Sequence, residues 1–124
     1  MSKDDQNIGE ALRREVMGSA HVDASLDNAT AFDRPLQDAA MEHVWGGVWT
    51  RGGLDRKTRS IVTVSMLIAL QAHGELKGHV RGALNNGVSP EEIREIIMHS
   101  AAYCGYPQAL SAMRVAREVV AQFE

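Results

Sequence analysis

The sequence has little of several residue types that mark particular classes of protein. It holds one cysteine, Cys104, so it can form neither an internal disulfide nor a CxxC redox pair. Aromatic residues make up only 5% of the 124 residues, and the formal net charge is -3. Because basic residues are not in excess, nucleic acid and anionic membrane surfaces are poor expectations as partners.

The sequence also lacks an apolar run long enough for a membrane. The run over residues 61–70 is too short to span a bilayer and is interrupted by Thr63 and Ser65. Residues 1–7 are polar and charged, with no apolar stretch behind a basic start, so we expect a disordered tail there and no signal peptide or anchor. These features predict a cytoplasmic protein.

What the sequence does contain is helical periodicity. The spacing of apolar residues predicts helices over residues 8–18, 35–46, 55–74, 75–86, 90–104 and 107–123, and Asp23 is the expected cap of a further helix that reaches Phe32. The β-branched run over residues 61–64 also suits a strand, but it continues without a turn signal and has no partner strand. We therefore predict an all-α fold, a single domain over residues 1–124 built as a compact bundle of about six helices.

Two of these helices have informative signals. Ser89 followed by Pro90 and Glu92 predicts a capping box at the start of the helix over 90–104, after a helix stop at Asn86. In the helix over 35–46, the predicted apolar stripe consists of Leu36, Ala39, Ala40, His43 and Val44. At 44% hydrophobic residues the core is modest, and small helical domains of this kind often complete their core by forming oligomers.

The helix over 75–86 carries the first candidate for chemistry. Its apolar stripe consists of Leu76, Val80, Ala83 and Leu84. Glu75 and His79, four residues apart, share a face at the edge of that stripe. A carboxylate that orients an imidazole suits proton transfer in a pocket. The alternative is a solvated face or a buried histidine whose hydrogen bonds are satisfied.

A second candidate is the glycine-rich loop over residues 47–54. It holds Trp49 and Arg51 beside Gly52 and Gly53, a composition that suits contact with a ligand. A tryptophan that fills the core or a subunit interface is the equal alternative for Trp49. Taken alone, each arginine, including Arg59, is also explained by an ion pair at a surface or interface.

Two further features favour ordinary structural roles. Glu95, His99 and Tyr103 follow one another at i+4 spacing and suit a polar helix face. Cys104 lies in an apolar stripe, where a free cysteine usually acts as a small hydrophobic residue. The five histidines follow no metal-ligand spacing, so the sequence does not predict a metal site.

Three segments carry a resemblance to a known family. They are HVDASL at 21–26, WGGVWTRGGLDRKTRSIVTVSMLIAL at 45–70 and GELKGHVRGALNNGVSPEEIREIIMHSAAYCGYP at 74–107. Together they resemble the carboxymuconolactone decarboxylase family, and within it the 4-carboxymuconolactone decarboxylases of aromatic catabolism. The chain lacks the CxxC of the alkyl hydroperoxidase D type of member, which favours the decarboxylase branch.

The resemblance implies an all-helical subunit in a ring, commonly a homohexamer or homotrimer, that works without a metal or organic cofactor. It implies loss of CO2 from 4-carboxymuconolactone to give 3-oxoadipate enol-lactone, in the protocatechuate branch of the β-ketoadipate pathway. On this basis His79 is the expected proton or oxyanion donor and Glu75 orients it. Arg51 and Arg59 are expected to hold the carboxylates of the substrate, and Trp49 to shape the pocket wall.

Two rival functions are kept. One is a thiol-dependent, peroxide-reducing enzyme that uses Cys104. The other is a helical module without catalytic activity that binds a ligand or partner through the loop around Trp49.

Overall fold

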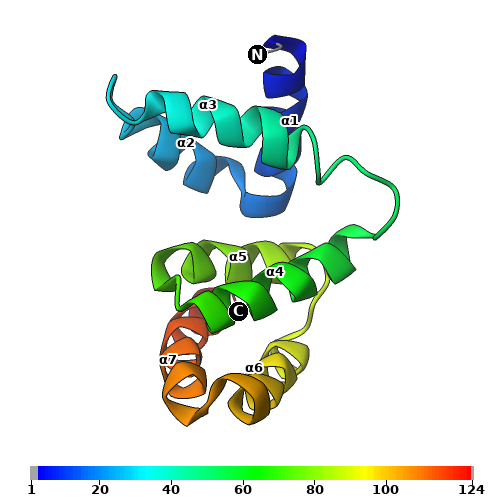
Figure 1. Cartoon of the computed structure of the whole chain (residues 1–124), viewed down its shortest axis with the longest axis vertical. Helices are drawn as coiled ribbons and strands as arrows, with labels where there is room; N and C mark the ends of the chain where they lie inside the picture. The colour runs from blue at the N-terminus through cyan, green and yellow to red at the C-terminus, as the bar shows by residue number, and fades with distance from the viewer. Residues whose placement is uncertain (1–2, 124) are drawn as a thin grey trace. The chain divides into compact units, whose positions relative to one another are not determined.

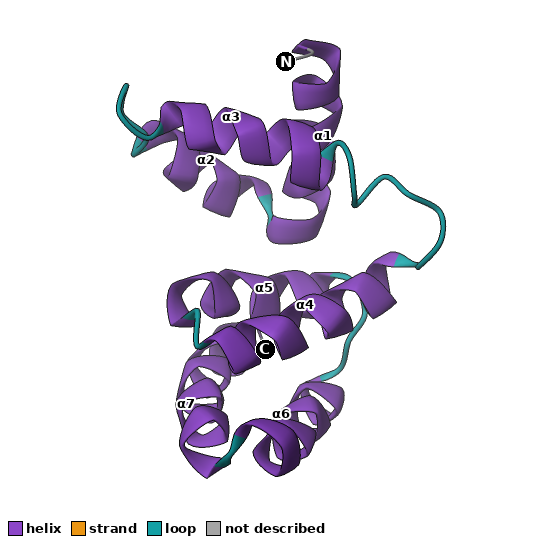
Figure 2. Cartoon of the chain, viewed as in Figure 1, coloured by secondary structure: helices purple, strands orange, loops and turns teal. Residues whose placement is uncertain are grey.

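The computed structural model describes residues 3–123, and within them the chain forms helices and no strand (Figures 1 and 2). This confirms the predicted all-α class. The elements are α1 (Lys3–Met17), α2 (Ser19–Asp27), α3 (Arg34–Ala40), the π-helical segment η1 (Met41–Trp45), α4 (Arg56–Leu70), α5 (His73–Asn85), α6 (Pro90–Cys104) and α7 (Tyr106–Phe123). No helix in this described range is both long and apolar enough to cross a membrane.

The chain divides after Asp55 into two compact units. The N-terminal unit holds α1 to η1, and the C-terminal unit, from Arg56 onward, holds α4 to α7. The expectation that both units form one domain stays a prediction.

In the N-terminal unit, α1 and α2 begin earlier than the sequence predicts. Residues 3–7, expected in a disordered tail, lie in α1, where acidic residues of the first turn favour the helix N-terminus; residues 1 and 2 lie outside the described range. Gly18, at φ 91°, separates α1 from α2, which starts at Ser19. The predicted cap at Asp23 is therefore wrong, and Asp23 instead accepts a 2.8 Å hydrogen bond from Arg14 Nη1.

The apolar stripe predicted for α3 and the residues after it is also wrong. Met41 and Trp45 are buried, whereas Leu36 is 75% exposed. The inward side of this segment is decided by tertiary packing, since η1 packs against α1. After α3 the wider π-helical turn, in which the Gly46 N–H donates to the carbonyl of Met41, five residues back, at 2.9 Å, also changes which side chains face inward. The core of the N-terminal unit consists of Leu12, Val16, Met17, Val22, Trp45 and Trp49.

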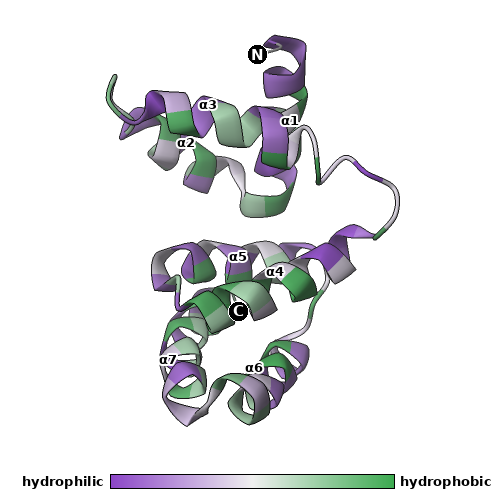
Figure 3. Ribbon diagram, viewed as in Figure 1, coloured by the Kyte–Doolittle hydropathy of each residue, from purple (hydrophilic) through white to green (hydrophobic). Residues whose placement is uncertain are grey.

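In the C-terminal unit, α4 and α5 form an antiparallel hairpin joined by a very short turn. The helix over the β-branched run is confirmed, and Figure 3 shows α4 polar at its start and hydrophobic along the rest. The stop expected near Gly74 occurs earlier, because Gln71 takes a left-handed φ of 57° and Gly74 lies within α5.

The start of α6 agrees with the prediction. Ser89 Oγ accepts from the Glu92 N–H at 3.0 Å, and Glu92 Oε1 accepts from the Ser89 N–H at 2.9 Å. The helices of this unit enclose one apolar core, to which each of α4 to α7 contributes buried side chains, among them Ile68, Leu76, Ile93 and Val119.

Candidate functional site

The predicted faces of α5 are confirmed. Leu76, Val80, Ala83 and Leu84 are all buried in the core. His79 is half-buried beside this stripe, and Glu75, one turn earlier, is exposed. Side chains four residues apart on a helix are neighbours. The imidazole therefore lies where the core meets its surface, with a solvent-facing carboxylate on the same side of the helix.

Arg59 belongs to the hairpin of α4 and α5, at the open end that lies away from the turn between the two helices. It is half-buried in the first turns of α4, and the adjacent Ser60 is hydrogen-bonded to Asn86, directly after α5. Glu75 lies about three turns before Asn86, roughly 16 Å along the axis, and His79 about two turns, roughly 10 Å. The structure thus places His79 between Arg59 and Glu75, and it does not bring Arg59 next to Glu75.

Trp49 and Arg51 belong to the N-terminal unit. Trp49 is only 7% exposed and stacks on Trp45, with ring centroids 4.9 Å apart. This placement fits the alternative in which Trp49 fills a core, and its role as a pocket wall stays a prediction. Arg51 is exposed, on a turn held by the 2.9 Å bond from Thr50 Oγ1 to the Gly46 carbonyl. The five predicted site residues are therefore divided between the two units.

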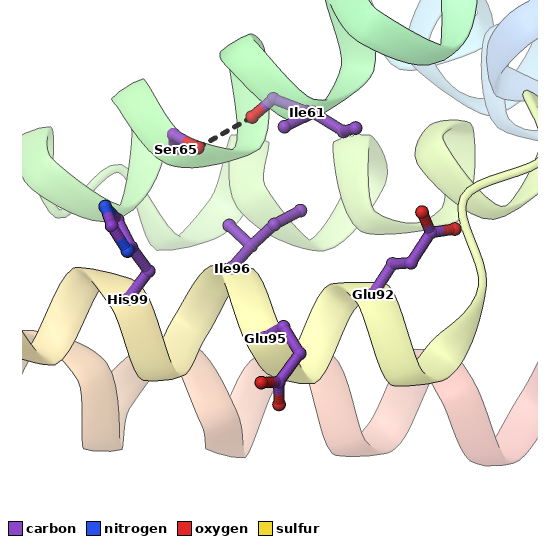
Figure 4. A pocket seen from close by; sticks show the side chains of 6 residues that line it. All are labelled: Ile61, Ser65, Glu92, Glu95, Ile96 and His99. Carbon is purple, nitrogen blue, oxygen red and sulfur yellow. Dashed lines mark hydrogen bonds between the residues drawn. The ribbon is translucent and has the colours of Figure 1, made fainter.

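A cleft of about 400 Å³ lies elsewhere in the C-terminal unit, between α4 and α6 (Figure 4). Its lining residues are Ile61, Ser65, Glu92, Glu95, Ile96 and His99, and none of them was predicted for the site. Figure 4 shows Glu92 and His99 directed toward α4 and Glu95 directed away from it. From the sequence, Glu95 and His99 were expected on a polar helix face. Their position at the cleft could not be predicted, because no local sequence pattern indicates how α6 packs on α4.

The lining of this cleft suits a dicarboxylate poorly, because none of its lining residues is a lysine or an arginine. The hydrogen bond from the Ser89 N–H and the ion pair with Lys57, at 3.2 Å, lower the pKa of Glu92. Glu92 therefore stays ionised at neutral pH, and its charge is already paired with that of Lys57.

Cys104 is half-buried at the end of α6, as a free thiol. Within residues 3–123, no three His, Cys, Asp or Glu side chains are grouped so that they could hold a metal ion.

Comparison with known proteins places the chain in a family. The sequence pattern of the carboxymuconolactone decarboxylase family matches residues 34–118. This range runs from α3 into α7 and includes all five predicted site residues. The chain belongs to the carboxymuconolactone decarboxylase family, which confirms the resemblance.

Two relatives are similar over most of their length. Nitrosuccinic acid decarboxylase npaB from Metarhizium robertsii is 47% identical over 112 residues, which cover 90% of this chain and 78% of the relative. The 4-carboxymuconolactone decarboxylase of Acinetobacter baylyi is 43% identical over 111 residues, which cover 90% and 83%. Both relatives are decarboxylases, which supports a carboxy-lyase, but their names give different substrates.

Proposed function

We propose that this protein decarboxylates 4-carboxymuconolactone to 3-oxoadipate enol-lactone without a metal or organic cofactor. The observation that carries this proposal is the 43% identity to a 4-carboxymuconolactone decarboxylase over 90% of the chain.

The substrate supplies its own electron sink. Its departing carboxylate is on the ring carbon that is vinylogous to the lactone carbonyl. When the bond to CO2 breaks, the electron pair passes through the ring double bond onto the carbonyl oxygen. A proton then adds to the ring carbon next to the carbonyl. The protein has to hold two carboxylates, stabilise the developing dienolate and deliver one proton.

The residues present suit these tasks. The guanidinium groups of Arg51 and Arg59 hold the two carboxylates, since a planar guanidinium binds a carboxylate through two hydrogen bonds. His79 delivers the proton or donates a hydrogen bond to the oxyanion, and its half-buried position strengthens such a bond. Glu75 orients the imidazole from one turn away.

A second candidate substrate is nitrosuccinate, favoured by the 47% identity to the Metarhizium enzyme. In this molecule the departing carboxylate is on the carbon that bears the nitro group. Loss of CO2 places the electron pair on the nitro oxygens as a nitronate, and protonation at carbon gives 3-nitropropanoate. Both candidates are small dicarboxylates with an internal electron sink, so the same arginines and imidazole serve either.

We also propose that the protein works as a homo-oligomeric ring, a hexamer or a trimer. Large apolar side chains with more than half of their surface exposed support burial against further copies. In the C-terminal unit they include Met66, Leu70, Met98 and Leu110. Light scattering coupled to size-exclusion chromatography measures the mass of the oligomer. A monomer at the concentration of the activity assay would contradict this part of the proposal.

The test of function is a comparison of two substrates. A cycloisomerase generates 4-carboxymuconolactone in situ from its muconate precursor, and CO2 and enol-lactone are followed with and without this protein, in the presence of a chelator. A parallel reaction contains nitrosuccinate, and 3-nitropropanoate is measured. Fast enol-lactone formation that survives the chelator is the expected result.

The other outcomes are equally specific. Faster release of CO2 from nitrosuccinate than from 4-carboxymuconolactone would make nitrosuccinate the assigned substrate, and the reaction would still be a decarboxylation. No acceleration of either reaction by folded protein would overturn the proposal. Thiol-dependent reduction of a peroxide by this protein would then favour the peroxide-reducing enzyme that uses Cys104. Binding of a ligand without formation of a product would favour the helical binding module.

A further inference from the structure

A side-chain link joins the two helices that carry Arg59 and His79. Asn86 Nδ2 donates a 2.9 Å hydrogen bond to Ser60 Oγ, and a longer one of 3.4 Å to the carbonyl of Arg56. Ser60 is 2% exposed, a polar side chain buried beside a largely apolar core. The bond is partly buried and its acceptor is shielded from water, so removing the amide would leave a buried hydroxyl without this partner.

The backbone of Asn86 is itself held in place. Its backbone N–H donates to the carbonyls of Gly82 at 3.0 Å and Ala83 at 3.1 Å, which fixes the residue to the last turn of α5. A carbonyl can only accept a hydrogen bond, so the contact with Arg56 identifies the amide nitrogen as the atom that faces α4. The backbone of Asn86 thus continues α5, and its side chain reaches α4 from this fixed point.

The contacts of Asn86 lie on both sides of Arg59. Asn86 binds the main chain of residue 56 and the side chain of residue 60. Thr63 Oγ1 donates a further 2.8 Å bond to the carbonyl of Arg59 itself. The two bonds from Asn86 oppose rotation of the first turns of α4 against α5, whereas the Thr63 bond lies within α4 and holds its own turn. A rotation of these turns would move the Arg59 side chain relative to His79 on α5.

We propose that Asn86 is a positioning residue that sets Arg59 relative to His79, so that guanidinium and imidazole act on the same small dicarboxylate. This inference rests on the proposed function, in which Arg59 binds a carboxylate. A mutation far from the reacting atoms that misplaces a substrate-binding group by about 1 Å can lower the rate roughly 100-fold. Loss of the bond between Asn86 and Ser60 should therefore have a measurable effect.

The test is a double-mutant cycle with Arg59. Asn86→Ala removes the donor and Ser60→Ala removes the acceptor. Each should raise KM for the dicarboxylate substrate about tenfold with a smaller change in kcat, as expected when a charge-assisted contact to the substrate is weakened. In an Arg59→Ala background, the same substitutions should change KM less than about twofold, because interacting residues are not additive.

Two features keep the test decisive. Serine inside a helix is no better a helix former than alanine, so Ser60→Ala keeps α4 helical even if Asn86→Ala fails to fold. The matched control is Gln122→Ala, which removes the 2.8 Å bond from Arg81 Nη2 between α5 and α7 and should leave KM unchanged.

The outcomes separate this inference from the function on which it rests. An unchanged KM in Ser60→Ala, or an equal increase with and without Arg59, would overturn the positioning role while the wild-type enzyme stays active. Wild-type protein that neither releases CO2 nor binds succinate in calorimetry would overturn the proposed function, and this inference with it.

Discussion

Replacement of Gly9 by alanine tests the closest helix contact in the N-terminal unit. Gly9 is buried on α1, against η1 and Gly46, which follows it. A Cβ at this position would overlap the carbonyl oxygen of Met41 and would lie 2.9 Å from the backbone nitrogen of Gly46. Both are main-chain atoms, which cannot rotate away as a side chain does, so α1 has to move away from η1.

The expected size follows from two opposing effects. Alanine is favoured over glycine inside a helix by about 1 kcal/mol. Overpacking of a tight contact costs about 1–3 kcal/mol, and an overlap with backbone lies at the upper end. We therefore expect Gly9→Ala to lower the free energy of unfolding by about 2 kcal/mol. Gly74→Ala is the matched control, since apart from its chain neighbours and the nearby backbone of α5 no atom lies within 4 Å of its Cβ position; it should be neutral or stabilise by up to about 1 kcal/mol.

The measurement is urea unfolding followed by helical circular dichroism on the wild type and both variants. The expected result is opposite signs for the two changes in midpoint, with unchanged slopes. A Gly9→Ala protein as stable as the wild type would refute the close approach of α1 to η1.

Four further changes address the site and its surroundings. His79→Ala should lower kcat by about 100-fold or more with an unchanged elution volume, the usual worth of general acid catalysis, and near-normal turnover would remove His79 from the mechanism. Arg51→Lys should mainly raise KM, because an ammonium group lacks the two-pronged geometry for a carboxylate; an unchanged KM would count against carboxylate binding. Cys104→Ser should leave decarboxylation nearly unaltered, whereas a thiol-dependent reduction of peroxide that this variant abolishes would favour the thiol-dependent enzyme. The contacts that lower the pKa of Glu92 stabilise the folded state at pH values above 4.5, the ordinary pKa of a glutamate. This contribution disappears as the pH falls through the lowered pKa. The difference in Tm between wild type and Glu92→Gln should therefore shrink on acidification, and a difference that does not depend on pH would contradict this reasoning.

The parts of the fold that could be predicted are those determined by neighbours in the chain. The capping box of Ser89 and Glu92 and the buried stripe of α5 depend on residues three or four apart, so both are visible in the sequence. The π-helical turn at η1 could not be predicted, because no residue preference marks it. Gln71 was missed for a related reason, since residues other than glycine rarely take a positive φ.

The candidate site shows the same division. The pattern of α5 indicated the edge position of His79, and the structure agrees. Asn86, in contrast, was recognised only as a helix stop, because its partner Ser60 is 26 residues away and no local pattern links them. The cleft between α4 and α6 was missed because it depends on how two helices pack.

The stacked indoles of Trp45 and Trp49 give this chain a built-in optical label. Both tryptophans of the sequence lie in the N-terminal unit, whereas both tyrosines, Tyr103 and Tyr106, lie in the C-terminal unit. Light absorbed by indole alone therefore reports on residues before Arg56, and tyrosine emission reports on the remainder. With ring centroids 4.9 Å apart and planes inclined by 26°, the two indoles are close enough for their excited states to couple. The near-ultraviolet signal of that pair should vanish as the rings separate, so unlabelled protein can reveal whether its two halves melt together or in turn.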